Sequence, residues 1–465
     1  MLKTIILTDI KQNIQSLKLQ VTFIIMLVVF AVGSIAYVFQ CHDAKEDYRS
    51  YYSKMSDKIR KDADVNITRV AVERNDHLFA PLSNGFIEDA KSQFIPNNIQ
   101  YNAYNVYGYS ISRKTSNPYL YLSNELNWGF IFSILSSFAI LLLSYDAISG
   151  EREQQTLKLV LSNPVSRGVV LFGKYVSIII SGVLMVLPGL LVSLIILILS
   201  GTLKMSSLLT FEIFGFTAVG ILFIATMSAL GLFCSVVSRS ANISLLISLT
   251  LWAAFLIFSP NLAVFAADQL FKVKNSETIQ NEVNTAMDAI NKAAPEGSWS
   301  MMGDNPFFPK HELRAKNQTN LVNAEKQIKD EWYNSQFIQY EKASRFTFLS
   351  PVSIFGMASE SITGSGYPRF HKNWDDMHTY QNQFLAWFKA IDAKDPKSPH
   401  WYNPQEDVST SKQKIKFEEL PLYSERLMTI PQRLTKALPG IVLLMVYSFL
   451  LFGITVVMFN RYDVR

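Results

Sequence analysis

The sequence predicts an all-α membrane protein with six transmembrane helices, a small α+β extracytoplasmic segment and a larger, mostly helical one. Of its 465 residues, 49% are hydrophobic and 17% are charged, whereas a soluble domain carries about 25% charged residues. The missing charge is concentrated in six apolar stretches of roughly 18 residues or more, the length that crosses a bilayer as a helix. These stretches cover residues 19–40, 128–145, 176–200, 208–237, 243–267 and 438–460.

The positive charges orient the six predicted spans. Lys3, Lys11 and Lys18 precede the first span, Arg239 lies between the fourth and fifth, and Arg461 follows the sixth. With six spans these segments share one side with the basic loop 146–175, and short loops rich in Lys and Arg face the cytoplasm. We therefore expect both termini in the cytoplasm, in a multi-pass protein of the bacterial inner membrane. The first apolar run exceeds the about 7–15 residues of a signal-peptide core, so we expect an uncleaved anchor.

The spans and hydrophilic segments divide the chain into seven predicted regions. The two termini lie in the first and last regions, and the two long hydrophilic regions, 41–127 and 268–437, are expected to face outward. They are 1–40 (cytoplasmic N-terminal helix and first span), 41–127 (first extracytoplasmic segment), 128–145 (second span), 146–175 (cytoplasmic coupling loop), 176–267 (spans three to five), 268–437 (second extracytoplasmic segment) and 438–465 (sixth span and short cytoplasmic tail).

Local patterns predict the elements of the two outward segments. In the first, alternating and β-branched residues at 65–73 and 99–111 predict strands, and residues 85–94 between them predict a short helix. In the second, capping residues and breakers predict helices at 276–293, 311–346 and 371–394, and a shorter one within 349–366 that ends at glycines. Residues 395–421 are rich in Pro and Lys and predict a loop.

The predicted spans contain almost no ionisable residues. Glu212 is the exception, near the outer end of the fourth span, where a carboxylate costs far less than at the bilayer centre. We interpret it as an interfacial or cavity-facing acid. No row of acids or histidines is present to relay protons, so an external energy source fits the sequence better than coupling to a proton gradient.

The segment from Ser149 to Tyr175 reads "SGEREQQTLKLVLSNPVSRGVVLFGKY". Its Gly168–Lys174 spacing matches a phosphate-binding loop, but such loops place Ser or Thr after the lysine to hold magnesium, and here Tyr175 follows. The intervening residues are also bulky and apolar. The other interpretation is a cytoplasmic amphipathic helix over Glu151–Leu161, with Leu157, Val160 and Leu161 on one face. It would end at Pro164 and lie along the inner membrane surface.

The stretch "SYDAISGEREQQTLKLVLSNPVSRGVVLFGKY" closely resembles the cytoplasmic loop between spans two and three of ABC type-2 exporter permeases. The resemblance is strongest to the group with enlarged extracytoplasmic segments that includes the permeases for nitrous-oxide-reductase maturation and gliding motility. The family's usual glycine before the threonine is Gln155 here. The matching residues are Tyr145, Asp146, Ser149, Gly150, Glu151, Arg152, Glu153, Thr156, Leu157, Ser162, Pro164, Ser166, Arg167, Gly173 and Lys174.

The resemblance implies the membrane subunit of a transporter rather than an enzyme. It implies a separate cytoplasmic ATPase that binds ATP and Mg, a second permease chain, and a complex of two permeases with two ATPases. The chain itself would then bind no cofactor and no metal. The residues implied to couple to the ATPase are Glu151, Arg152, Glu153, Thr156, Leu157, Pro164 and Arg167.

Two other functions stay open at this point. Large outward segments also suit an envelope-assembly or mechanotransmission subunit that grips a periplasmic protein without transporting a substrate. A membrane metalloenzyme based on His371 and His378 is the third hypothesis, although their spacing matches no standard set of ligands. No basic stripe with interleaved aromatic residues is present, so we expect no nucleic-acid partner.

Overall fold

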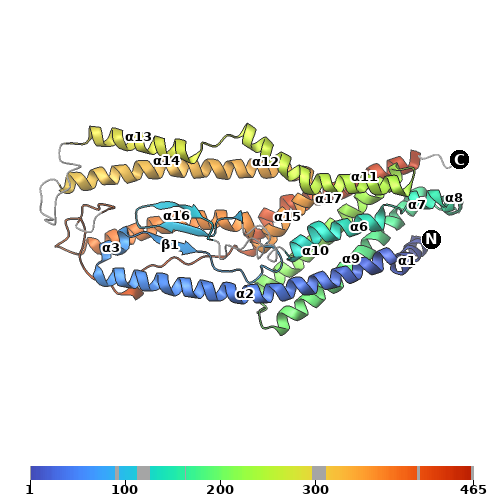
Figure 1. Cartoon of the computed structure of the whole chain (residues 1–465), viewed down its shortest axis with the longest axis horizontal. Coiled ribbons are helices and arrows are strands. Elements are labelled where there is room, and N and C mark those ends of the chain that lie inside the picture. The colour runs from blue at the N-terminus through green and yellow to red at the C-terminus, as the bar shows by residue number, and fades with distance from the viewer. Residues whose placement is uncertain are drawn as a thin grey trace.

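Six helices among the described residues are long and apolar enough to cross a membrane, and they gather at one end of an elongated molecule (Figure 1). The computed structural model describes residues 2–89, 94–112, 126–162, 164–295, 311–405 and 409–461. The predicted fold class is confirmed. The spans are α2 (Leu17–Val65), the run of α5 (Trp128–Phe130), η3 (Ile131–Ser136) and α6 (Ser137–Ser144), α9 (Arg167–Leu199), α10 (Ser207–Val237), the run of α11 (Ala241–Ala253), η4 (Ala254–Phe258) and α12 (Ser259–Leu270), and α17 (Ile430–Arg461).

The first span continues far beyond its apolar stretch. α2 begins after Ser16, whose hydroxyl accepts a hydrogen bond from the Leu19 amide at 3.3 Å, and runs unbroken to Val65. Its 49 residues make a rod of about 74 Å at a rise of 1.5 Å per residue. The predicted boundary at residue 40 therefore lies inside one helix, because the charged stretch that follows has no Gly or Pro to end it.

α10 lies at the centre of the membrane bundle. Its apolar residues share one core with residues from all the other spans. Phe223 stacks on Phe355 with 4.6 Å between ring centroids, and a Cβ added to Gly220 would collide with the ring of Phe132. Aromatic packing and the small side chain of this glycine therefore fix how closely α10 approaches its neighbours.

A short helix of the second hydrophilic segment enters this same core. α15 (Pro351–Thr363) is buried along most of its length, and Phe355 belongs to the apolar core of the spans. Ser350 precedes the helix and donates a hydrogen bond at 2.8 Å to the Phe255 carbonyl in η4. The predicted helix within 349–366 is confirmed, but it packs against the spans rather than with the other helices of the hydrophilic segment, because apolar residues cover most of its surface.

The hydrophilic part of the molecule, which is predicted to face outward, contains a three-stranded antiparallel sheet in the order β1 (Asn75–Leu78), β2 (Asn98–Tyr101), β3 (Val106–Ser110). β2 and β3 form a hairpin inside the stretch 99–111 that was predicted as a strand, with Gln100 opposite Gly108. β1 was not predicted. It pairs with β2, and its short polar sequence carries no alternating pattern.

The prediction of a strand at 65–73 is wrong. Val65 ends α2, and α3 (Ile67–Val72) follows at once. The Oδ1 atom of Asn66 caps α3 by accepting a hydrogen bond from the Arg69 amide at 2.7 Å. The β-branched composition favours a strand, but residues 67, 68, 70 and 71 are buried, which is the spacing of one helical face.

The prediction of a helix at 85–94 is also wrong over residues 85–89, which form turns; residues 90–93 lie outside the described residues. The carbonyls of Phe86 and Ile87 accept hydrogen bonds from the Trp128 and Gly129 amides at 2.9 and 2.8 Å. These carbonyls therefore satisfy the free amides at the start of α5 and make no helix of their own.

Three other predicted helices of the second hydrophilic segment are confirmed. They are α13 (Ser276–Ala293), α14 (His311–Phe346) and α16 (Gly366–Asp392), and α16 begins five residues before its predicted start. α14 and α16 pack with the sheet around two apolar cores, one of which contains Phe337 and Trp374. Short 3-10 turns occupy Thr347–Leu349 and Phe417–Glu419.

Candidate functional site

The loop between the second and third spans forms an elbow of two short helices, α7 (Ser149–Glu153) and α8 (Thr156–Leu161). It lies at the same end of the molecule as α1 (Leu2–Gln15) and the end of α17 (Figure 1). A single helix over Glu151–Leu161 was predicted. That prediction is wrong because Gln155 adopts a left-handed conformation, with φ 59° and ψ 9°, which interrupts the helical path.

The left-handed backbone at Gln155 explains a feature of the sequence. The resembling permeases place glycine at this position, and glycine adopts positive φ without a steric penalty. A side chain with a Cβ is uncommon there. In this chain the kink between α7 and α8 is therefore made by Gln155, for which a positive φ is strained.

The elbow has an inner apolar face and an outer polar one. Leu157 is 2% exposed and joins the core of the spans, and Leu161 packs against that core. On the outside Gln154, Lys158 and Leu159 are exposed, with Leu159 at 68%. The burial of Leu157 agrees with the predicted apolar face. Leu159 was missed, because the kink at Gln155 changes which side chains of α8 face outward.

The three charged residues of α7 bind within the chain. Glu151 accepts a hydrogen bond from Lys174 at 2.6 Å, and Arg152 donates to the Ser238 carbonyl at 2.5 Å. Glu153 accepts from the Ala241 amide at 3.2 Å, which caps the start of α11. These contacts fasten the elbow to α9, α10 and α11. Glu151 and Arg152 therefore already have partners within this chain.

The remaining predicted coupling residues shape the elbow and its exit. Thr156 donates to the Glu151 carbonyl at 3.2 Å and so joins α8 to α7. Arg167, at the start of α9, donates to the Asn460 carbonyl at 3.0 Å in the last turn of α17. Pro164 is exposed between the two helices. The elbow itself therefore contacts the third, fourth and fifth spans, and Arg167 connects the start of α9 to the sixth span.

A second polar site lies at the outer end of the bundle. Glu212 of α10 forms an ion pair with Arg433 of α17, and their side chains are 4% and 1% exposed. Arg433 also donates to the Thr363 carbonyl at 2.7 Å, at the end of α15. Asn84 donates to the same carbonyl at 2.7 Å. Glu212 was predicted as an interfacial or cavity-facing acid; the structure makes it one half of a buried pair.

Arg433 was missed in the sequence because it lies five residues before the sixth apolar stretch and reads as an outer-loop cation. No local pattern marks its partner. Arg433 and Glu212 are 221 residues apart, so only the packing of α10 against α17 brings them together.

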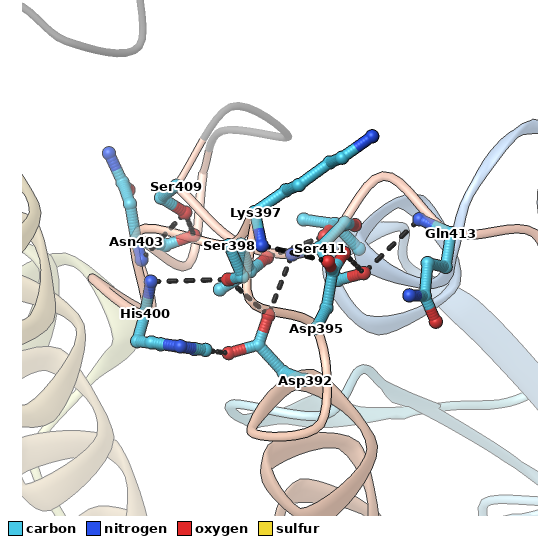
Figure 2. A network of polar contacts seen from close by, with 11 residues as sticks. Asp392, Asp395, Lys397, Ser398, His400, Asn403, Ser409, Ser411 and Gln413 are labelled. Carbon is cyan, nitrogen blue, oxygen red and sulfur yellow. Dashed lines mark hydrogen bonds and ion pairs between the residues drawn. The ribbon is translucent and has the colours of Figure 1, made fainter.

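A polar network in the hydrophilic part of the molecule is centred on Asp392 at the end of α16 (Figure 2). Its carboxylate is fully buried and accepts hydrogen bonds at 2.6 Å from the Ser398 hydroxyl, the Ser411 amide and His400 Nδ1. His400 has φ 56°. These donors satisfy both carboxylate oxygens, so the network ties the loop after α16 to its helix and offers no obvious ligand set for a metal.

The histidines of the metalloenzyme hypothesis have other partners. His371 lies 3.2 Å from Asp375, and His378 Nε2 lies 3.3 Å from Asp330. Within the described ranges no group of three or more His, Cys, Asp or Glu residues has the geometry to hold a metal ion. In β1, burial lowers the pKa of His77 to about 4.

A family profile described as ABC-2 family transporter protein matches residues 3–464, nearly the whole chain. No curated protein matches the sequence.

Proposed function

Because the chain belongs to the ABC-2 family of transporter proteins, and is thus a multi-pass membrane subunit rather than the ATPase, we propose that it is the permease of an exporter that docks a separate cytoplasmic ATPase on the elbow α7–α8. The ATPase would bind ATP and Mg. Two copies of this chain and two ATPases would complete the complex, in the bacterial inner membrane with both termini in the cytoplasm.

The observation that carries the docking proposal is the outer face of the elbow. Gln154, Lys158 and Leu159 present an apolar side chain beside a cation and an amide, which suits a cleft with an apolar floor and an acidic rim. Leu157 anchors the same helix on the span core. A displacement of α8 would therefore be transmitted directly to the membrane bundle, because the packed helices move as rigid bodies.

The ectodomain supports placing the chain in the subgroup with enlarged extracytoplasmic segments, similar to the permeases for nitrous-oxide-reductase maturation and gliding motility. α2 extends well past its apolar stretch, and β1–β3 pack with α14 and α16 into a folded body. A body of this size offers a surface to a periplasmic protein.

Co-purification tests the docking proposal. The chain is tagged and purified in mild detergent from its native host, and the bound ATPase is quantified. We expect Leu159→Asp, and separately Lys158→Glu, to lower the ATPase yield at least 10-fold, which corresponds to about 1.4 kcal/mol. Lys394→Glu, an exposed lysine at the distal end of α16, is the matched control and should change nothing. An unchanged yield from both elbow variants would contradict the assignment of the docking face.

Charge reversal of Glu151 is a poor test of docking, although the sequence suggests it. Its partner is Lys174, so Glu151→Lys would set two buried cations against each other and disturb the elbow itself. Transport by proteoliposomes, with an ATPase-dead partner as control, separates an exporter from an assembly subunit: ATP-dependent movement of a candidate substrate supports the exporter, and ATP-dependent change in a bound periplasmic protein alone supports the other.

A further inference from the structure

Lys174 lies at the junction of three elements. It belongs to the first turns of α9, and its side chain is 8% exposed. Its ammonium lies 2.6 Å from Oε1 of Glu151 in α7 and 3.6 Å from Oδ2 of Asp9 in α1. One buried cation therefore joins the elbow, the third span and the N-terminal helix.

The two carboxylates depend on this one cation. Their side chains are 24% and 16% exposed, and Asp9 Oδ2 and Glu151 Oε2 have no hydrogen-bond partner among the residues that the structure covers. A buried acid without a compensating charge or donor is unfavourable. Without Lys174 the two acids would repel each other, and α1 and α7 would have no polar contact through this site.

α1 is held against α9 at two more places. Gly173 gives it room, since a Cβ there would lie 2.9 Å from the Ile5 side chain. Asn13 donates to the Ser181 hydroxyl of α9 at 3.1 Å. α1 therefore follows α9 over three turns, whereas its polar link to α7 passes through Lys174.

We propose that Lys174 is the positioning residue that makes the elbow and α1 move as one body, so that displacement of the elbow is delivered to α1 and the first span as well as to α9. This inference rests on the proposed function, because it assigns a path to the motion that an ATPase would impose on α8. Lys174 binds no nucleotide and touches no substrate in this role.

The test uses the full complex with spin labels on α1 and α8. The two buried free cysteines, Cys41 and Cys234, are replaced by serine, and Thr8→Cys and Ser162→Cys are labelled, since Ser162 is exposed at the end of α8 and lies outside the proposed docking face. The distance between the labels is measured with and without trapping by ATP and vanadate. With Lys174 present, we expect one narrow distance that trapping does not change, because both helices move together.

Lys174→Met should give a distance that shifts on trapping, because the elbow then moves without α1, and Lys174→Arg should restore the unchanged distance. Lys3→Met removes an exposed lysine of α1. It is the control and should behave as the parent. A merely structural defect would alter both states equally. A distance that shifts in the parent, or that stays fixed in Lys174→Met, would overturn the proposal.

Asp9→Asn covers the case in which Lys174→Met fails to fold. It removes the 3.6 Å pair and leaves the Lys174–Glu151 pair intact, so we expect the same shift on trapping. If no ATPase binds the unlabelled chain, the docking proposal fails. The ion bridge is then tested in the isolated chain: a broader distribution of α1–elbow distances in Lys174→Met than in the parent supports it. Identical distance distributions in the two proteins reject it.

Discussion

Replacing Arg433 with methionine removes the cation from the buried pair that joins α17 to α10. The guanidinium is 1% exposed and contacts Glu212, the Thr363 carbonyl at 2.7 Å and the Met428 carbonyl at 3.0 Å. Methionine keeps much of the apolar stem but has no donors. The variant therefore leaves a buried carboxylate without its ion pair and three carbonyls, those of Ile362, Thr363 and Met428, without this donor.

The magnitude follows from burial. Removing one partner of a buried ion pair costs about 3–5 kcal/mol, so we take about 4 kcal/mol for Arg433→Met. Unfolding entropy is about 2.1 cal/mol/K per residue, which for 465 residues gives roughly 1 kcal/mol/K. We therefore expect the midpoint of thermal unfolding to fall by about 4 °C. Adding Glu212→Met removes the stranded charge and should recover about 2 kcal/mol of the loss.

The assay is thermal unfolding of the purified chain in detergent, followed as the loss of monodisperse protein, for the two single variants and the double variant. Arg426→Met, which removes an exposed arginine seven residues earlier, is the matched control. Single-variant losses that add within about 0.5 kcal/mol in the double variant would show that the pair is not coupled, and the reasoning from burial would be refuted.

Three further outcomes are expected. Gln155→Gly should keep ATPase co-purification at or above the parent level, whereas Gln155→Val should lower it several-fold, because a β-branched residue resists positive φ. Lowering the pH from 7 to 5 should lower the free energy of unfolding by about 2 kcal/mol. His77 has a pKa of about 4 in the fold and stays neutral at pH 5, whereas in the unfolded chain it takes up a proton below about pH 6.5. Chemical denaturation at the two pH values should show a smaller difference in His77→Phe. Asp392→Asn should destabilise the loop after α16 by about 3 kcal/mol, read as faster amide exchange at Ser411, and equal exchange rates in variant and parent would contradict the role of the buried carboxylate.

The apolar and charge patterns of the sequence were sufficient for the membrane architecture. Six long apolar stretches could satisfy their backbone groups only as helices in a bilayer, and all six are confirmed as helices. Strong caps and breakers likewise fixed α13 and α14 at their predicted ends. The predictions of a strand at 65–73 and of a helix over residues 85–89 were wrong, because the preferences of a few local residues weigh less than the surfaces that bury them.

In the predicted coupling loop, residues 146–175, some features could likewise be predicted from the sequence and others could not. Its motif could be located from the residues alone, and the missing Ser or Thr after Lys174 argued against a phosphate-binding loop. The kink at Gln155 could not be predicted, because glutamine carries no local signal for positive φ. Without the kink, the outward position of Leu159 could not be predicted either.

What the sequence alone determined is the class of the protein: its spans, the side on which its basic loops gather, and the segment that resembles an ATPase-docking loop. These depend on composition and on order along the chain. The tertiary structure decided which charges meet. Lys174 with Asp9 and Glu151, and Arg433 with Glu212, are pairs between elements far apart in the sequence. A buried charge is tolerated only where packing brings it a partner, and packing between distant elements leaves no local pattern to read.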